Sequence, residues 1–188
     1  MIYESAIHAL GRGVIVGVPT DTVYGLAIDP FNEAAVARLF ELKGRPARKP
    51  IGLLVASLEQ AETVAEIKGT ARELAERHWP GALTLIVRPR VVLSNWVGDE
   101  QSSTVGVRVP DHPTTLGLLN ETGPLAVTSA NVSNGAETYN HTEAEAVFGD
   151  RVAFYVEGTC PGGVASTVVD ATSDDIVVLR EGALNFGG

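Results

Sequence analysis

The sequence has a single cysteine, Cys160, so it cannot form an internal disulfide bond. Its four histidines are spread along the chain, and none lies at metal-ligand spacing from another histidine or from the cysteine, which argues against a structural zinc site. No apolar run reaches the ~18 residues that a membrane helix needs, and the N-terminus shows no basic region followed by an apolar one. These absences favour a protein of the reducing cytoplasm, with no membrane span.

Basic residues are scarce as well. The chain of 188 residues has 14 Lys and Arg against 23 Asp and Glu, which gives a formal net charge of -9. Proteins that grip duplex nucleic acid usually present a basic face, so this charge balance argues against that class for the surface as a whole. The length and the hydrophobic content of 45% predict one domain over residues 1–188, with a core of its own.

Four of the basic residues nevertheless fall within seven consecutive positions, at Lys43, Arg45, Arg48 and Lys49. Concentrated cations repel one another, so an acidic chain that gathers them is expected to use them as a local anion site. A solvated loop explains the same spacing equally well, because charge runs usually lie on the surface. The expected neighbours, a helix that ends at Lys43 and a buried strand that begins after Pro50, favour a loop with a defined position.

Hydrophobic periodicity predicts a mixed α/β domain with about seven strands and with polar groups at the strand ends. Candidate strand segments lie at residues 14–18, 51–55, 82–87, 104–109, 125–128, 152–156, 164–170 and 176–179. Candidate helices lie at residues 5–10, 34–42, 58–67, 70–77, 113–121 and 142–148. Residues 19–26 read as a hydroxyl-rich segment after the first strand, where α/β proteins often bind ligands, although these hydroxyls could also merely close a turn.

Several catalytic motifs are absent from the chain. No Gly-Lys-Ser/Thr triplet marks a Walker A loop, and Gly158, Gly162 and Gly163 do not open a helix as a dinucleotide-binding fingerprint requires. Ser129 lies in Thr-Ser-Ala-Asn rather than in the Gly-x-Ser-x-Gly elbow of hydrolases. Cys160 has no evident base nearby in the sequence, so we expect a buried thiol rather than a nucleophile.

The remaining candidates are a group of basic side chains together with hydroxyl and amide side chains. Its members are Thr22, Lys43, Arg45, Arg48, Lys49, Thr104, Arg108, Ser129, Asn131, Ser166 and Arg180. None of them is an obvious nucleophile. The group suits phosphoryl or nucleotidyl transfer, in which positioning and charge neutralisation lower the barrier without a covalent enzyme intermediate.

Short motifs in this group resemble one known family, the YrdC-type threonylcarbamoyl-AMP synthases. The Lys-x-Arg and Ser-x-Asn signature of that family is matched by Lys43-Gly44-Arg45, Lys49-Pro50 and Ser129-Ala130-Asn131. Further segments match in the same order, at residues 19–26, 79–84, 107–113 and 166–170. The resemblance implies a YrdC-like α/β fold, a mixed twisted open sheet with flanking helices, in the short single-domain form without an additional C-terminal domain.

The resemblance also implies a reaction. L-Threonine, bicarbonate and ATP would give L-threonylcarbamoyladenylate and pyrophosphate, with Mg2+ held by the ATP phosphates and by no protein side chain. The product would pass to downstream tRNA threonylcarbamoyl-transfer proteins, which modify the adenosine beside the anticodon.

The roles of the family's residues, transferred position by position, divide the group by substrate. Threonine would be held by Thr22, Arg108 and Ser166. ATP would be contacted by Arg45, Lys49, Thr104, Ser129 and Arg180. The catalytic signature would comprise Lys43, Arg45, Ser129 and Asn131. The chain departs from the family at Leu54, where many members have a histidine, and near Glu137, where a hydroxyl contact is displaced.

Two functions of other kinds are alternatives to this one. An RNA-binding or ribosome-maturation module of the same fold would need a basic surface, and the net charge of -9 allows at most a weak RNA contact. A domain that handles carbamoyl-adenylate for another acceptor, as in hydrogenase maturation proteins, usually belongs to a much longer chain.

Overall fold

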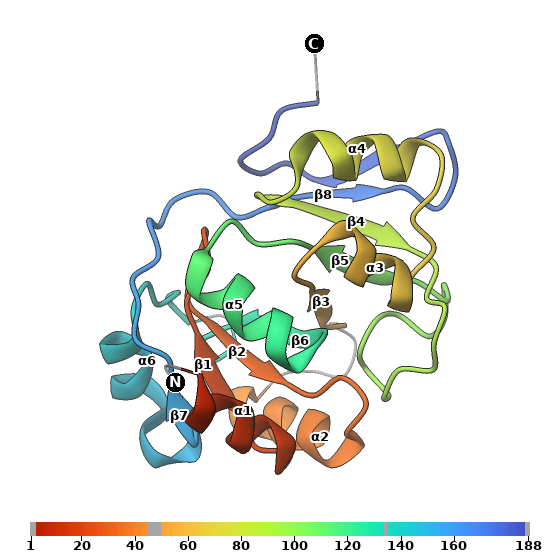
Figure 1. The fold of residues 1–188 in the computed structure, drawn as a ribbon. Coiled ribbons are helices and arrows are strands. Elements are labelled where there is room, and N and C mark those ends of the chain that lie inside the picture. Colours follow the sequence, from red (N-terminus) through yellow and green to blue (C-terminus); the bar gives the residue numbers. More distant parts are fainter. Residues whose placement is uncertain (1–2, 45–49, 134, 187–188) are drawn as a thin grey trace.

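The computed structural model describes residues 3–44, 50–133 and 135–186, which form one nine-stranded sheet with six α-helices around it (Figure 1). The strands are β1 (Val16–Val18), β2 (Gly25–Ile28), β3 (Gly52–Leu54), β4 (Leu83–Val87), β5 (Val105–Arg108), β6 (Leu125–Ser129), β7 (Phe154–Tyr155), β8 (Thr167–Asp170) and β9 (Val177–Arg180). The helices are α1 (Glu4–Gly11), α2 (Glu33–Lys43), α3 (Leu58–Val64), α4 (Thr70–His78), α5 (Pro113–Thr122) and α6 (His141–Phe148). In this part of the chain, no helix has the length and apolar character needed to cross a bilayer.

The sheet is open and mixed, as the sequence predicted. Its order is β7-β1-β2-β6-β3-β5-β4-β8-β9, so β7 and β9 form its two edges. It contains parallel pairs, such as β3 with β5 and β4 with β8, and antiparallel ones, such as β3 with β6 and β4 with β5. Figure 1 shows the sheet crossing the molecule from β7, near the N-terminus, to β8 below α4.

The prediction of about seven strands was too low for the described residues, which form nine. The strand that the sequence reading missed is β2, because residues 19–26 were read as one polar segment. Only the first part of that segment is a turn. Gly25–Ile28 follows it at once and is buried throughout, so it shows no alternation of polar and apolar residues that would separate it from the polar turn. The turn lets β2 run antiparallel to β1.

Helix α2 brings Lys43 to a defined place. The side chain of Asn32 caps its first turn by accepting a hydrogen bond from the backbone N–H of Ala35, as an N-cap asparagine does. Leu39 and Phe40 bury the inner face of the helix. The helix ends at Gly44, whose left-handed backbone (φ 58°) suits glycine, so the predicted helix end is confirmed.

The strands pack against two different cores because their side chains alternate between the two faces of the sheet. On one face, Leu26 and Leu53 join the larger core, to which α2, α3, α4 and α6 all contribute. On the other face, Ala27 and Leu54 join a smaller core made with α1 and α5. The smaller core covers β1, β2, β6 and the end of β3, so none of the described helices packs over the rest of that face.

A buried tyrosine holds the turn before β2 in place. Tyr24 is fully buried, and its hydroxyl donates a hydrogen bond to the carbonyl of Val156 at 2.6 Å. Burial raises the pKa of Tyr24 above its ordinary value, so this hydroxyl stays protonated and keeps its donor role. The backbone of Tyr24 also pairs with Thr138 and Ala130. The residue therefore ties the turn to the segments that follow β6 and β7.

We predict that Tyr24→Phe lowers the free energy of unfolding by about 1–3 kcal/mol, because the buried carbonyl of Val156 would lose its donor. Urea denaturation followed by circular dichroism would measure the change. Tyr155→Phe is the matched control, since the Tyr155 hydroxyl donates to Gly149 from a half-buried position, and the lost bond can be replaced by water. An equal loss in both variants would contradict the anchoring role of Tyr24.

Candidate active site

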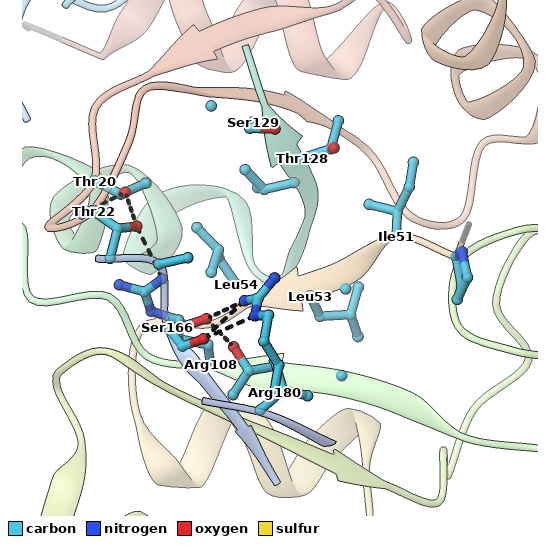
Figure 2. A pocket seen from close by; sticks show the side chains of 18 of the residues that line it. Thr20, Thr22, Ile51, Leu53, Leu54, Arg108, Thr128, Ser129, Ser166 and Arg180 are labelled. Atoms are coloured by element: carbon cyan, nitrogen blue, oxygen red, sulfur yellow. Dashed lines mark hydrogen bonds between the residues drawn. The ribbon is translucent and has the colours of Figure 1, made fainter. Parts of the chain in front are cut away.

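A cavity of about 380 Å3 lies over the part of the sheet face that the helices leave uncovered (Figure 2). Strands β3, β4, β5, β6, β8 and β9 and the turn before β2 all contribute to its wall. Six of the residues predicted from the sequence line it: Thr22, Thr104, Arg108, Ser129, Ser166 and Arg180. The fold thus brings together residues that are far apart in the chain, at one place.

Two glycines leave the floor of the cavity bare. Gly52 on β3 and Gly106 on β5 alternate with the core residues Leu53 and Val107, so they face the cavity. A Cβ atom on Gly52 would lie 3.0 Å from the carbonyl oxygen of Gly106. Because neither residue has a side chain, the backbone of both strands is uncovered here, and a ligand can lie directly on the sheet.

Arg108 is held by three acceptors at the end of β5. Its Nη2 pairs with Asp21 Oδ1 at 2.5 Å, its Nη1 donates to Thr22 Oγ1 at 3.1 Å, and its Nε donates to the carbonyl of Gly81 at 3.0 Å. Only 9% of the Arg108 side chain and 13% of the Asp21 side chain is exposed. Sequence reasoning missed Asp21 and Gly81 as partners of Arg108.

Hydroxyl groups close the turn that carries Asp21 and Thr22. Thr20 Oγ1 donates to the carbonyl of Val23 at 2.7 Å and accepts from the N–H of Thr22 at 3.1 Å. The alternative of a turn-closing role is therefore correct for Thr20. Both threonines line the cavity (Figure 2), but only the Thr22 hydroxyl accepts a hydrogen bond from Arg108.

Ser166 joins the two groups of predicted residues. Its hydroxyl lies 2.9 Å from that of Thr84 on β4, and its carbonyl accepts a hydrogen bond from Arg180 Nη2 at 2.8 Å. Arg180 reaches the same place from the edge strand β9 (Figure 2). A residue assigned to threonine therefore touches a residue assigned to ATP, so ligands bound by the two groups would be adjacent.

The Ser-x-Asn segment lies beside the end of α2. Lys43 is 3% exposed, and its Nζ donates to the carbonyl of Ser129 and to Asn131 Oδ1, the latter at 3.4 Å. The Ser129 hydroxyl donates to Asn131 Oδ1 at 2.6 Å, and Asn131 Nδ2 donates to the carbonyl of Gly135 at 2.8 Å. Ser129 lines the cavity, whereas Lys43 and Asn131 lie behind it. The other predicted cations, Arg45, Arg48 and Lys49, lie outside the described residues.

The loop before β5 carries Thr104. Its hydroxyl lies 2.7 Å from that of Ser102, which also donates to Asp99 Oδ2 at 2.9 Å. Asp99 and Glu137 are the acidic residues that line the cavity. Within residues 3–44, 50–133 and 135–186, no three His, Cys, Asp or Glu side chains are grouped so that they could hold a metal ion.

Comparison with known proteins decides the family. The Sua5_yciO_yrdC family model, which is described as telomere recombination, matches residues 8–182. The chain belongs to the Sua5/YciO/YrdC family. A threonylcarbamoyl-AMP synthase of Vibrio parahaemolyticus is 36% identical over 185 residues, which cover 96% of this chain and 98% of that protein. One of Pyrococcus abyssi is 42% identical over 181 residues, which cover 92% of this chain and 52% of that protein.

A solved structure agrees with this placement. The crystal structure of P. abyssi Sua5 complexed with L-threonine superposes with a TM-score of 0.87 at 38% sequence identity, over 95% of this chain and 53% of that one. The predicted family and fold are thus confirmed. The chain spans about half of the P. abyssi protein and nearly all of the Vibrio one.

Cys160 lies behind the cavity rather than in it. It is 3% exposed, and its sulfur accepts a hydrogen bond from the N–H of Thr20 at 3.2 Å. Burial raises the pKa of the thiol to about 11. The predicted buried thiol is confirmed, and at neutral pH it is protonated and supports the turn that carries Thr22.

We predict that iodoacetamide at pH 7.5 labels Cys160 at least ~100-fold more slowly in the native protein than in urea, because only the thiolate reacts and native Cys160 is protonated and enclosed. Intact mass spectrometry would follow the reaction. A Val92→Cys variant in a Cys160→Ser background is the positive control, since Val92 is 92% exposed and should label quickly without unfolding. Native labelling of Cys160 at the rate of that control would contradict the prediction.

Proposed function

We propose that the protein is an L-threonylcarbamoyladenylate synthase, which makes threonylcarbamoyl-AMP and pyrophosphate from L-threonine, bicarbonate and ATP. The observation that carries the proposal is the contact between Ser166 and Arg180, where the threonine and ATP residues meet in one cavity. The relatives that share the fold and are named threonylcarbamoyl-AMP synthases support the same reaction. An acidic chain that encloses cations also suits anionic substrates better than duplex RNA.

The chemistry needs two anions held side by side. The amine of threonine captures CO2 as a carbamate and releases a proton. A carbamate oxygen then attacks the α-phosphate of ATP, and the bond from that phosphorus to the pyrophosphate oxygen breaks. Both reactants are anionic, so they approach each other only where cations offset their repulsion, and the enzyme contributes by positioning and by charge neutralisation.

In this proposal Arg108 pairs with the carboxylate of threonine, with Thr22 and Ser166 beside it. A guanidinium and a carboxylate form a strong charge-assisted pair, and Arg108 already faces the cavity with its orientation set by three acceptors. Thr22 and Ser166 offer hydroxyl groups that can bond the polar atoms of the amino acid.

Thr104, Ser129 and Arg180 are proposed to contact ATP in the cavity. Arg45 and Lys49 belong to the same proposed set through their sequence motif alone, since they lie outside the described residues. Lys43 and Asn131 would act through Ser129, and the ammonium group of Lys43 would offset phosphate charge. Mg2+ would be bound by the ATP phosphates and would offset their charge. This agrees with the described residues, which include acidic residues in the cavity wall but no cluster that could hold a metal ion. The product would pass to tRNA threonylcarbamoyl-transfer proteins.

We predict that the purified protein releases pyrophosphate from ATP and Mg2+ only when both threonine and bicarbonate are present. Serine and glycine should substitute poorly, because they lack the threonine methyl group and a methyl contact is worth about ten-fold or more in specificity. A coupled pyrophosphate assay with each component omitted in turn would measure this. Release without threonine would contradict the proposal, and so would no release together with salt-sensitive RNA binding.

We predict that Arg180→Ala raises the KM for ATP about ten-fold or more and changes the melting temperature little. Arg180 lines the cavity but is exposed on an edge strand, so its loss removes a charge without opening the core. Steady-state kinetics with varied ATP would measure the change. Arg77→Ala is the matched control, since Arg77 is an exposed arginine on α4 outside the cavity lining. Equal KM values in the two variants would rule out a nucleotide contact for Arg180.

A further inference from the structure

The three hydrogen bonds of Arg108 use three of its five N–H donors. A guanidinium has five N–H donors, one on Nε and two on each terminal nitrogen. Gly81 takes the Nε donor, Thr22 takes one on Nη1 and Asp21 takes one on Nη2. Each terminal nitrogen therefore keeps one N–H outside these bonds. Two such donors, one on each terminal nitrogen, are what a carboxylate needs for a two-pronged pair.

Of the ion pair Asp21–Arg108, only one member lines the cavity. Arg108 lines it, whereas Asp21 is bonded to Arg108 Nη2 but is not among the lining residues. With side-chain exposures of 9% and 13%, theirs is the least exposed ion pair of the described residues. A cation this enclosed needs an opposite charge nearby, and Asp21 supplies it without occupying the place of the ligand.

The turn after α4 supplies the third acceptor. The N–H of Gly81 donates to the carbonyl of Val109 at 2.9 Å, which places the Gly81 carbonyl against Arg108 Nε. A Cβ atom on Gly81 would lie 2.6 Å from the carbonyl oxygen of His78, so this turn is too tight for a side chain. Arg108 is thus clamped between two turns from distant parts of the chain.

We propose that Asp21 is a positioning residue that holds Arg108 in the orientation that receives the carboxylate of the amino-acid substrate. The inference rests on the proposed function, because it takes that carboxylate as the ligand of Arg108. Asp21 touches no substrate and acts through Arg108 alone. Without the charge of its carboxylate the bond to Nη2 is weaker, and the two remaining donors are held less firmly toward the ligand.

The test is Asp21→Asn, which keeps the shape of the side chain and removes its charge. We expect the KM for threonine to rise about ten- to one-hundred-fold and the KM for ATP to stay within about two-fold, because only the carboxylate contact is disturbed. A KM does not depend on how much of the sample is folded, so a loss of stability would not imitate this split. Asp150→Asn, at an exposed aspartate outside the cavity lining, is the matched control.

A second readout separates positioning from simple support of the fold. L-Threoninol, which has a hydroxymethyl group where threonine has its carboxylate, would be tested as a competitive inhibitor against threonine. The wild type should bind threonine far more tightly than threoninol. In Asp21→Asn this gap, the ratio of the inhibition constant of threoninol to the KM for threonine, should shrink by the same factor as the KM rises. A residue with only a structural role would leave the gap unchanged.

Asp21→Glu keeps the negative charge next to Arg108 and so protects the fold, but it moves the carboxylate by one methylene. We expect an intermediate rise in the KM for threonine. A wild-type KM for threonine in folded Asp21→Asn, with the threoninol gap intact, would overturn the inference alone. A wild-type enzyme whose pyrophosphate release needs no threonine would overturn the proposed function, and this inference with it.

Discussion

The site depends on one constraint, the alternation of side chains along the strands of a sheet that is covered unequally. Of the described helices, α2, α3, α4 and α6 pack against one face, and α1 and α5 pack against the other. Beyond the area that α1 and α5 cover, residues on this face are not buried in a core. They form the floor of the cavity, and two of them are glycines. The cavity thus arises where part of the sheet is left bare.

The charges follow from the same arrangement. The protein is acidic overall, yet Arg108 and Lys43 are nearly enclosed at two sides of the cavity. Each has its own acceptors: a carboxylate for Arg108, and a carbonyl and an amide oxygen for Lys43. Because a buried cation is stable only with such partners, the positions of these two side chains are set by the protein and not by the ligand. Preorganised charge of this kind is what transfer between two anions requires.

Much of this could be predicted from the sequence, because strong local signals mark it. Asn32 and Gly44 mark the ends of α2, and apolar runs mark most strands. The ordered motifs identified the family and six of the residues that line the cavity. Strand β2 was missed because all four of its residues are buried, so it has no alternating pattern, and it directly follows a polar turn. Asp21 and Gly81 were missed because their role is a contact with Arg108, which lies 87 and 27 residues away. The glycines at 52 and 106 alternate with core residues, and that pattern was the available signal of a bare floor.

The wall of the cavity draws its side chains from Thr22 near the start of the described chain to Arg180 near its end. During synthesis on the ribosome, the smaller core, whose residues precede β8 and β9, can therefore form before the wall of the cavity is complete. Thr22 and Arg108 can meet early, but the Arg180 side of the cavity stays open until the last strand has emerged and has paired with β8. The wall of the cavity is therefore complete only after β9 has paired with β8, however early the rest of the sheet forms.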